Sequence, residues 1–321
     1  MEISSLSPGD PSIARALERD GVVFVRDLLD SGLVKETRAR LERFEREILP
    51  TIPRSHYDYQ ADGRTLHQYR DVHAFDPWFA ELADGPPIMD CVRRAVPWEP
   101  VVFYAEVFPK PPGAHGAFPH QDLYTAPVDP PHFLHMWIPL EDVDESNGGI
   151  TFYVGTHKLG VAPHVETPGG LAPTVDPAVL ERLEPYQVHA ACPAGSAALF
   201  VGEMIHRSGP NRSDRPRPAL VIAFRGRDTL AKSGPEILVS VVRKAFCDEL
   251  GVQLRADDDF YALGGTDEAA ERIAGRLSGD YRTPLGATDL RTHPTASALA
   301  ALLAERGADP AGQPVPRGGN G

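Results

Sequence analysis

Apolar positions in the first hundred residues follow helical periods on either side of one short strand. Residues 13–17 form a short apolar helical patch, and Val22–Val25 is a β-branched run of strand length. Apolar residues recur between charges from Leu33 to Ile48, which predicts an amphipathic helix. Helical signals return from Trp78 to Val96. Residues 50–75 are polar, aromatic and rich in histidine without a clear period, so we expect a loop there.

From residue 100 the pattern changes to short apolar runs separated by Gly, Pro, Asn and Asp. Most of the intervening segments are too short to hold helices, so the pattern predicts an antiparallel sandwich or barrel rather than alternating strands and helices. No Gly-rich nucleotide-binding motif interrupts it. The predicted strands are Val101–Phe108, Phe133–Leu140, Gly149–Val154, Gln187–Ala191, Ser196–Val201 and Ala219–Arg225.

A second change, near residues 233–235, returns the chain to a helical period. We expect helices over Glu236–Leu250, Asp267–Leu277 and Pro294–Arg306, with Pro294 suited to the first turn. A helical segment after a long strand-rich segment indicates two domains.

The chain is therefore predicted to consist of two domains and a tail. Residues 1–234 form the strand-rich domain and residues 235–306 form the helical one. Residues 307–321 are rich in Gly, Pro and Ala, which is typical of a disordered tail.

Composition narrows the class of protein. Proline makes up 32 of the 321 residues, well above the usual ~5%, which favours strands and loops. The net charge of −13 argues against nucleic acid as a partner. No apolar run is long enough to cross a membrane, and the N-terminus lacks the features of a signal peptide. The three cysteines are far apart, which excludes a disulfide scaffold and suits the reducing cytoplasm.

Two tripeptides place a histidine two residues before an acid, and these are the first candidates for chemistry. They are His120-Gln121-Asp122 and His164-Val165-Glu166. On a strand, residues i and i+2 point to one side, so both side chains can bind one metal ion. Iron(II) oxygenases use two histidines and one carboxylate and leave the other positions of the iron open. The second tripeptide lies in a Pro- and Gly-rich loop and is the weaker candidate.

A third ligand has to come from a distant part of the sequence, and His206 fits. It ends an apolar run that has little other reason to end in histidine, and turn residues follow it. Arg217 then opens the next strand, and a hairpin would place it beside His206. A guanidinium near a metal suits a dicarboxylate, because it binds a carboxylate through two hydrogen bonds.

The remaining histidines have simpler interpretations. We expect His56, His67 and His73 to be largely solvated, with a substrate-pocket wall as the alternative. Five more are expected in loops, on the surface or around the site rather than as ligands: His115, His132, His135, His157 and His189.

Several short strings occur in one order over residues 10–227, and as a set they are specific. With them the chain resembles the phytanoyl-CoA dioxygenase family of iron(II)/2-oxoglutarate oxygenases. The strings are Asp20-Gly21-Val22-Val23, Lys110-Pro111-Pro112-Gly113, His120-Gln121-Asp122, Trp137-Ile138-Pro139-Leu140-Glu141-Asp142-Val143-Asp144, Asn147-Gly148-Gly149, Gly155-Thr156-His157-Lys158 and His206-Arg207-Ser208-Gly209-Pro210-Asn211-Arg212-Ser213.

The resemblance implies a double-stranded β-helix, or jelly roll, with helices packed outside. It implies that His120, Asp122 and His206 bind Fe(II), and that O₂ is a cosubstrate beside 2-oxoglutarate. Arg217 would hold the distal carboxylate of 2-oxoglutarate, with Arg215 as the nearby alternative. The intact Asp122 favours hydroxylation, while desaturation, epoxidation and cyclisation remain open.

Two further positions are assigned less sharply by the resemblance. Trp137 packs behind the metal or is a core aromatic residue. Lys110 contacts the cosubstrate or faces solvent. Both are therefore candidates for the cofactor-binding wall.

The C-terminal segment, residues 236–306, resembles the acyl or peptidyl carrier domain of modular synthetases, a small four-helix bundle. In such domains a serine at the start of the second helix carries phosphopantetheine. Here the string is Gly264-Gly265-Thr266-Asp267-Glu268, and Asp267 stands at the serine position. An aspartate still suits a helix N-terminus, but it has no hydroxyl to modify. We therefore expect a carrier-like domain without phosphopantetheine, kept for docking or support.

Taken together, the two resemblances predict an oxygenase of secondary metabolism. Its substrate would be a small molecule or a carrier-tethered acyl or aminoacyl group, and its partner a modular synthetase or carrier protein. The alternative is a non-catalytic scaffold protein of such a synthetase, against which the complete ligand set argues.

Overall fold

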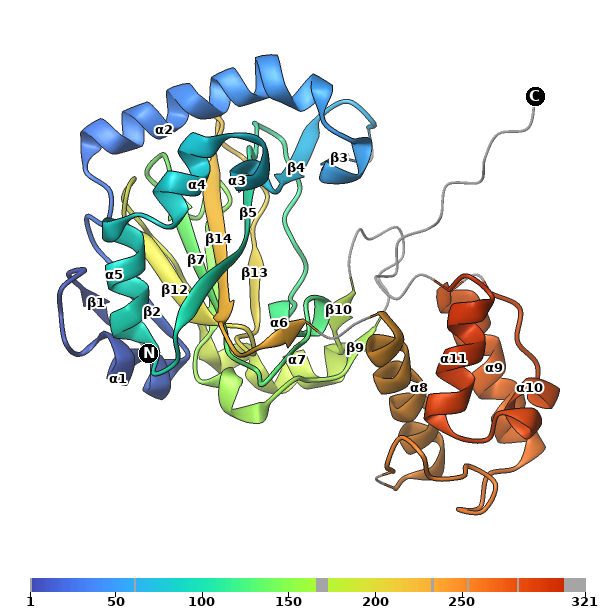
Figure 1. Ribbon diagram of the computed structural model, residues 1–321. Helices are drawn as coiled ribbons and strands as arrows, with labels where there is room; N and C mark the ends of the chain where they lie inside the picture. The colour runs from blue at the N-terminus through green and yellow to red at the C-terminus, as the bar shows by residue number, and fades with distance from the viewer. Residues whose placement is uncertain are drawn as a thin grey trace, which may run out of the picture. The chain divides into compact units, whose positions relative to one another are not determined.

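The computed structural model describes residues 2–60, 62–165, 173–231, 234–252, 254–281 and 283–308. The chain divides into two compact units, Met1–Leu230 and Ala231–Gly321 (Figure 1). Of the predicted tail at 307–321, positions 309–321 lie outside the described residues. Ala308, which does belong to the described part, is buried in the core of the second unit.

Short strands dominate the first unit. The strands of the chain are β1 (Ser5–Leu6), β2 (Val22–Val25), β3 (Tyr57–Tyr59), β4 (Leu66–Arg70), β5 (Pro100–Phe108), β6 (Val128–Asp129), β7 (Phe133–Pro139), β8 (Ile150–Tyr153), β9 (His164–Val165), β10 (Thr174–Val175), β11 (Gln187–His189), β12 (Ala197–Val201), β13 (His206–Ser208), β14 (Ala219–Gly226) and β15 (Leu230–Ala231).

Helices alternate with short strands in the first hundred residues, and the described part of the second unit is mainly helical. The α-helices are α1 (Ile13–Asp20), α2 (Ser31–Arg43), α3 (Val72–Phe75), α4 (Pro77–Ala83), α5 (Pro86–Ala95), α6 (Asp122–Thr125), α7 (Pro177–Leu183), α8 (Gly234–Leu250), α9 (Asp267–Tyr281), α10 (Ala287–Thr292) and α11 (Ala296–Glu305). A π-helical turn, Phe44–Ile48, continues α2. Short 3₁₀ turns lie at Leu49–Thr51, Arg54–His56, Thr156–Leu159 and Glu184–Tyr186.

Two sheets make up the body of the first unit. The larger has the order β1-β2-β12-β7-β14-β5-β4-β3 and the smaller the order β11-β8-β13 (Figure 1). One apolar cluster contains Trp137 and Val221 of the larger sheet together with Ile150 and Phe152 of the smaller. The sheets therefore pack face to face, which confirms the predicted jelly roll with helices outside.

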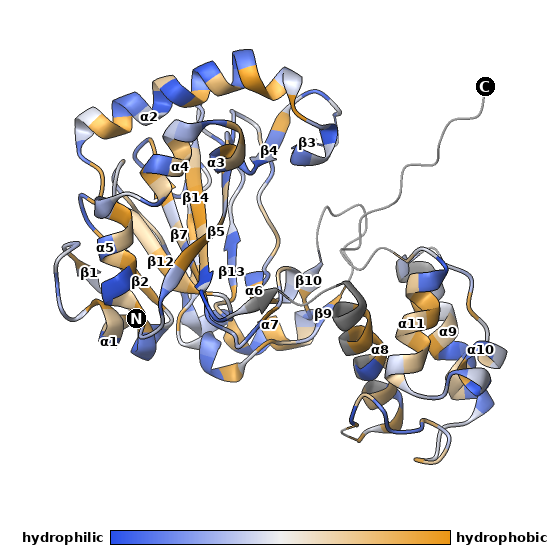
Figure 2. Cartoon of the chain, viewed as in Figure 1, coloured by the Kyte–Doolittle hydropathy of each residue, from blue (hydrophilic) through white to orange (hydrophobic). Residues whose placement is uncertain are grey.

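Alternation along the central strands gives the larger sheet two different faces. On β7, Leu134, Met136 and Ile138 join the apolar core beneath α1, α2, α4 and α5. His135 and Trp137 of the same strand point to the opposite face, toward the smaller sheet, because side chains alternate along a strand. In Figure 2 the strands of this sheet are largely apolar, whereas α2 alternates polar and apolar residues along its length.

The prediction of a loop over residues 50–75 is wrong. The segment contains β3, β4 and α3, and β4 pairs with β5 to extend the larger sheet. Tyr69 anchors it, because its ring is fully buried and stacks on Phe44 at a centroid distance of 5.5 Å. The strand was concealed by its polar inner face, which carries Gln68 and Arg70. Those side chains face the interior of the fold rather than solvent.

Two local predictions around the histidines are also wrong. β13 pairs with β8 in the smaller sheet, whereas β14 pairs with β5 and β7 in the larger. His206 therefore begins a strand of the smaller sheet, whereas Arg217 lies two residues before β14 of the larger sheet, so the two residues do not begin the arms of a hairpin. Asp122 does not continue a strand from His120 but is the first residue of α6, because the chain turns after the extended Gln121.

The second unit is mainly helical among its described residues. α8, α9 and α11 match the three predicted helices, and α10 was not predicted. Pro294 lies just outside α11 rather than in its first turn, and the Thr295 side chain caps that helix by accepting from Ala298 N. Phe246, Phe260 and Leu299 are at the centre of its apolar core. Throughout the described part of the chain, every helix is too short or too polar to cross a membrane.

Candidate metal centre

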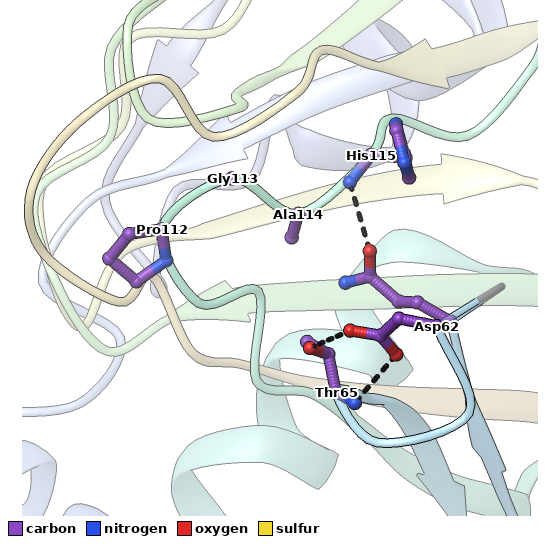
Figure 3. Close-up of a pocket in the computed structure, with 7 residues that line it drawn as sticks. Asp62, Thr65, Pro112, Gly113, Ala114 and His115 are labelled. Atoms are coloured by element: carbon purple, nitrogen blue, oxygen red, sulfur yellow. Dashed lines mark hydrogen bonds between the residues drawn. The ribbon is translucent and has the colours of Figure 1, made fainter.

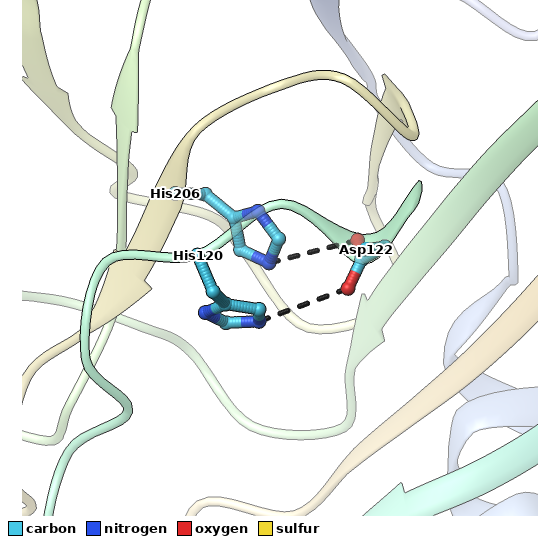
Figure 4. Close-up of side chains that lie close together, drawn as sticks. All are labelled: His120, Asp122 and His206. Carbon is cyan, nitrogen blue, oxygen red and sulfur yellow. Dashed lines mark ion pairs between the residues drawn. The ribbon is translucent and has the colours of Figure 1, made fainter. Parts of the chain in front are cut away.

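Three side chains converge between the two sheets. His120 lies just before α6, Asp122 begins α6, and His206 begins β13 (Figure 4). The Nε2 atoms of His120 and His206 lie 3.7 and 3.8 Å from the two carboxylate oxygens of Asp122. One potential ligand atom from each residue lies within 4.8 Å of the others, and this is the one such cluster found among the described residues.

Backbone pairing brings the two histidines together. His120 N donates to His206 O at 2.9 Å, and His206 N donates to His120 O at 3.0 Å. This single bridge ties the loop before α6 to the first residue of β13, and the two imidazole centroids lie 4.3 Å apart. Residues that are 86 positions apart in the chain therefore reach one point.

Hydrogen bonds fix the orientation of both rings. His120 Nδ1 lies 2.7 Å from Phe118 O, and His206 Nδ1 lies 3.0 Å from Met204 O. A carbonyl oxygen can only accept, so each Nδ1 is the donor and carries the proton. In the neutral rings each Nε2 then has a free lone pair, and both are directed at Asp122. This is the tautomer that a metal ion requires.

The ionisation of the cluster is also suited to a cation. Burial lowers the pKa of His206 to about 4, which keeps its ring neutral at physiological pH. Burial raises the pKa of Asp122, but His135, His206 and His120 outweigh burial and hold that pKa below its ordinary value. A neutral imidazole beside a carboxylate is the protonation state in which such groups bind metals.

His135 supports Asp122 from behind. Its Nδ1 lies 2.6 Å from the second carboxylate oxygen of Asp122, and its Nε2 lies 2.9 Å from Tyr104 Oη. Burial opposes the charge on this ring, but Asp122 prevails and raises the pKa of His135. From the sequence, His135 is one of the histidines expected in loops, on the surface or around the site rather than as a ligand. Its alternation with Trp137 on β7 was the signal that would have put it on the inner face.

Arg217 is a buried cation without an anionic partner among the described residues. It is 2% exposed, and its Nη2 donates to Gly148 O at 2.7 Å. Its Nε and Nη1 are buried and have no hydrogen-bond partner. Burial lowers its pKa to about 9. Buried donors are rarely left unsatisfied, so this guanidinium presents two N–H groups that fit an incoming carboxylate.

Trp137 lies against this guanidinium, and Lys110 is close enough for its pKa to be affected by the charge of Arg217. The Arg217 guanidinium carbon lies 5.3 Å from the centroid of the Trp137 ring, within the range of a cation–π contact. Lys110 is buried, and its Nζ donates to Ser208 Oγ at 3.0 Å and to His115 O at 3.3 Å. Burial, and secondarily the charge of Arg217, lower the pKa of Lys110 to about 7. The solvent-facing interpretation of Lys110 is therefore wrong.

A glycine shapes the floor of this cationic corner. Gly148 has a φ of +86°, and a Cβ there would collide with the Lys110 side chain and approach Gly209 O to 2.8 Å. Its own carbonyl accepts from Arg217. Glycine is therefore required at position 148 of the string Asn147-Gly148-Gly149. Only a residue without a side chain lets Lys110 and Arg217 pack against the same stretch of backbone.

The alternative candidates for the arginine and for the metal ligands lie outside the cluster or outside the described residues. The Arg215 side chain is 80% exposed. His164 stacks on Tyr124 and accepts from Gln121 N, while Glu166 lies outside the described residues. Four other histidines contact residues outside the three converging ones: His56 with Asp71, His132 on Trp98, His157 with Glu18 O and His189 with Thr151.

Two hollows on the surface of the first unit are separate from the metal cluster. One, of about 230 Å³, is lined by Gln60, Asp62, Thr65 and residues 112–115, with Gln60 Oε1 accepting from His115 N (Figure 3). The other, of about 900 Å³, runs beside α2 and is crossed by the Arg38–Glu141 ion pair. None of His120, Asp122 and His206 lines either hollow.

In the second unit, Asp267 is held at the start of α9. Arg291 forms an ion pair with it, and Tyr261 Oη donates to it at 3.4 Å. The hydroxyl of the preceding Thr266 accepts from Ala269 N at 3.2 Å, as a helix cap does. The side chain that begins this helix is therefore an ion-paired carboxylate, and the adjacent hydroxyl is engaged with the backbone.

Family models match both units. The model for "Phytanoyl-CoA dioxygenase (PhyH)" matches residues 17–219, and that for "Phosphopantetheine attachment site" matches residues 240–303. Phytanoyl-CoA dioxygenase domain-containing protein 1 of Danio rerio is 33% identical over 155 residues, 46% of this chain and 52% of that protein. The peroxisomal phytanoyl-CoA dioxygenase of Mus musculus is 24% identical over 228 residues, 66% of this chain and 67% of that protein. The chain thus spans about half the length of several curated relatives.

Solved structures share the fold of the first unit. The α-ketoglutarate-dependent epimerase SnoN from nogalamycin biosynthesis superposes with a TM-score of 0.57 at 22% identity, over 70% of this chain and 85% of that chain. EctD from S. alaskensis, solved with 2-oxoglutarate and 5-hydroxyectoine, has a TM-score of 0.61 at 18% identity, over 70% and 79%. At these identities the likeness establishes the fold of the described residues.

Proposed function

Because the chain belongs to the phytanoyl-CoA dioxygenase family, we propose that its first unit is an iron(II)- and 2-oxoglutarate-dependent oxygenase. His120, Asp122 and His206 would hold the iron, and Arg217 would hold the distal carboxylate of 2-oxoglutarate. The relatives named above, among them EctD solved with 2-oxoglutarate, support this assignment.

The observation that carries the proposal is that two sets of polar atoms need partners of opposite kinds: three electron-pair donors need a cation, and two N–H groups need an anion. The lone pairs of two oriented imidazoles and a carboxylate converge without a proton to share, which fits a divalent cation. Nearby, the buried Arg217 has two unsatisfied N–H groups, which fits a carboxylate. Iron(II) with 2-oxoglutarate supplies both missing partners at once.

Each residue then has a physical role in the reaction. When bound, iron and 2-oxoglutarate supply the activation of O₂, with decarboxylation of the cosubstrate to succinate. The two histidines and Asp122 would hold the metal as three protein ligands, which would leave its other positions for cosubstrate and O₂. Arg217 orients the cosubstrate from its far end, and Trp137 packs on the guanidinium and excludes water. Lys110 adds a second positive charge beside it.

We propose hydroxylation of an unactivated C–H bond as the outcome, because Asp122 is present as a ligand. The related structures carry different outcomes in their names, including an epimerase and a carbocyclase. Desaturation, epoxidation and cyclisation therefore stand as the alternative results of the same oxidation. The substrate we propose is a small molecule or a carrier-tethered acyl or aminoacyl group, given the carrier-like unit in the same chain.

Succinate formation tests this function without knowledge of the substrate. The protein with Fe(II), 2-oxoglutarate and O₂ should convert 2-oxoglutarate to succinate and CO₂ in equal amounts, slowly, through uncoupled turnover. Omission of iron or its replacement by Zn²⁺ should abolish the product. An absence of both succinate and iron binding would favour the non-catalytic scaffold.

His135 should act as a positioning residue for Asp122. His135→Ala removes the 2.6 Å hydrogen bond to the carboxylate, and loss of such a support costs metal sites about 10- to 100-fold in affinity. Iron affinity can be measured by competition with a chelator. His135→Asn, whose amide can mimic Nδ1, should restore much of the affinity, and the exposed His189→Ala should have no effect. Equal loss in the Ala and Asn variants would argue against the hydrogen bond as the cause.

We further propose that the second unit is a carrier-like domain that does not carry phosphopantetheine. Asp267 occupies the attachment position and is paired with Arg291. Incubation with a phosphopantetheinyl transferase and coenzyme A should leave the mass of the wild-type protein unchanged, whereas Asp267→Ser should create a site and gain one arm. A mass gain in the wild type would contradict the proposal, and Thr266→Ala would then show whether that hydroxyl is the acceptor.

A further inference from the structure

Glu106 is a buried carboxylate on the inner face of the larger sheet. It is 8% exposed and lies on β5, two residues from Tyr104, whose hydroxyl contacts His135. In the strand register Glu106 is opposite Val221, and Val221 is opposite Trp137. The three side chains therefore share the face that carries the metal cluster, with Glu106 two strands from Trp137, a distance of about 10 Å.

The strand between them carries small side chains on this face. The inner positions of β14 are Ala219, Val221 and Ala223, whereas its outer positions are Leu220, Ile222 and Phe224. Small side chains thus form the floor between the Arg217–Trp137 corner and Glu106. A ligand above this floor would have the cationic corner at one side and a carboxylate at the other.

A chain of hydrogen bonds holds Glu106 in place from the adjacent strand. Arg70 donates to Asp58 at 2.6 and 2.7 Å and to Gln68 Oε1 at 3.5 Å. Gln68 in turn donates through its amide nitrogen to Glu106 Oε2. Because Arg70 fixes the carbonyl end of the Gln68 amide, the amide orientation is set and the Glu106 side chain is pre-oriented.

The charge of Glu106 has no partner of its own. No cation lies within 4 Å of it among the described residues, and Gln68 makes its one recorded hydrogen bond. Arg70 is opposite it in the register but is engaged by Asp58. His135 is engaged by Asp122. Arg217 would be neutralised by the distal carboxylate of 2-oxoglutarate, and the recorded partners of Lys110 Nζ are Ser208 Oγ and His115 O. Burial accordingly raises the pKa of Glu106 to about 7.

We propose that Glu106 is a substrate-recognition residue that pairs with a protonated amine, so that the enzyme selects aminoacyl over simple acyl groups. Buried charges are stable when paired, and an ammonium group is the counter-ion that a pre-oriented buried carboxylate lacks. The inference rests on the proposed oxygenase function and narrows its substrate class. The structural role, tying β4 to β5 through Gln68, is the competing explanation for Glu106.

The test compares matched probes with the full-length protein, Fe(II), 2-oxoglutarate and O₂. The probes are a panel of aminoacyl thioesters of N-acetylcysteamine and the corresponding des-amino acyl thioesters. We expect the wild type to form succinate at least about tenfold faster with its best aminoacyl probe than with the des-amino counterpart, with product oxygenation seen by mass spectrometry. Glu106→Gln should reduce that preference toward one. Glu99→Gln, an exposed glutamate, should retain it.

Three results would overturn the inference. Equal stimulation by both probe classes in the wild type does so without any variant. A preference that survives in a folded Glu106→Gln protein assigns Glu106 a structural role. Basal succinate formation that no aminoacyl probe stimulates excludes the substrate class while leaving the oxygenase function intact. Absence of basal succinate, by contrast, is a failure of the proposed function itself.

Discussion

Asp122→Ala and His206→Ala should each abolish iron-dependent succinate formation. Each change removes one of three converging ligands and, for Asp122, also the negative charge that compensates the cation. Since the loss of a residue that merely supports a ligand costs about 10- to 100-fold in metal affinity, loss of a ligand itself should cost at least ~100-fold. Chelator competition measures the affinity, and product analysis measures the turnover.

His164→Ala is the matched control for these ligand variants. His164 belongs to the second His-x-acid tripeptide and is partly buried near the cluster, but its Nδ1 and Nε2 are engaged by Ala162 and Gln121. Its removal should leave iron stoichiometry at one per chain. Full iron affinity in His206→Ala, or loss of iron in His164→Ala, would mean that the ligand assignment is wrong.

Arg217→Met should raise the concentration of 2-oxoglutarate needed for half-maximal succinate formation by roughly 30- to 5,000-fold. This corresponds to the 2–5 kcal/mol typical for loss of one partner of a buried charged pair. Iron binding should persist, because Arg217 contacts none of the three ligands. Arg215→Met, which alters a neighbouring exposed arginine, should change neither property.

The same Arg217 variant should not weaken the apoprotein. Without cosubstrate, the guanidinium is a buried charge with two unsatisfied donors, and an apolar side chain of similar length removes that cost. We therefore expect an unchanged or higher unfolding temperature for Arg217→Met without 2-oxoglutarate, and a smaller stabilisation when 2-oxoglutarate is added. A large fall in apoprotein stability would instead assign Arg217 a structural role through Gly148.

The sequence predicted most of the sheet because the core strands bury one apolar face against the outer helices. Residues 133–140 and 219–225 have strong β-branched and aromatic character, and their bounds differ from the structure by about one residue. β4 was missed for the opposite reason. Its inner face carries Gln68 and Arg70, so the alternation that identifies a half-buried strand is absent, although Tyr69 is buried.

The candidate site was predicted as a set of residues but not as a geometry. The proximity of His120 and His206 follows from one backbone bridge that no local pattern encodes. Arg217 reaches the site from the segment just before β14, because the chain crosses from the smaller to the larger sheet between β13 and β14. Glu106 was not singled out, and His135 was left open between a loop, the surface and the surroundings of the site. A polar residue within a buried strand can be recognised as functional only when its neighbours on the same face are known.

Anaerobic binding of Fe(II) and 2-oxoglutarate tests the central claim most directly. We predict one iron and one 2-oxoglutarate per chain, with 2-oxoglutarate bound far more tightly in the presence of iron, and with iron lost in Asp122→Ala but retained in Arg217→Met. Such coupled binding requires His120, Asp122, His206 and Arg217 to form one site. The claim would be contradicted if 2-oxoglutarate bound independently of iron, or if neither ligand bound.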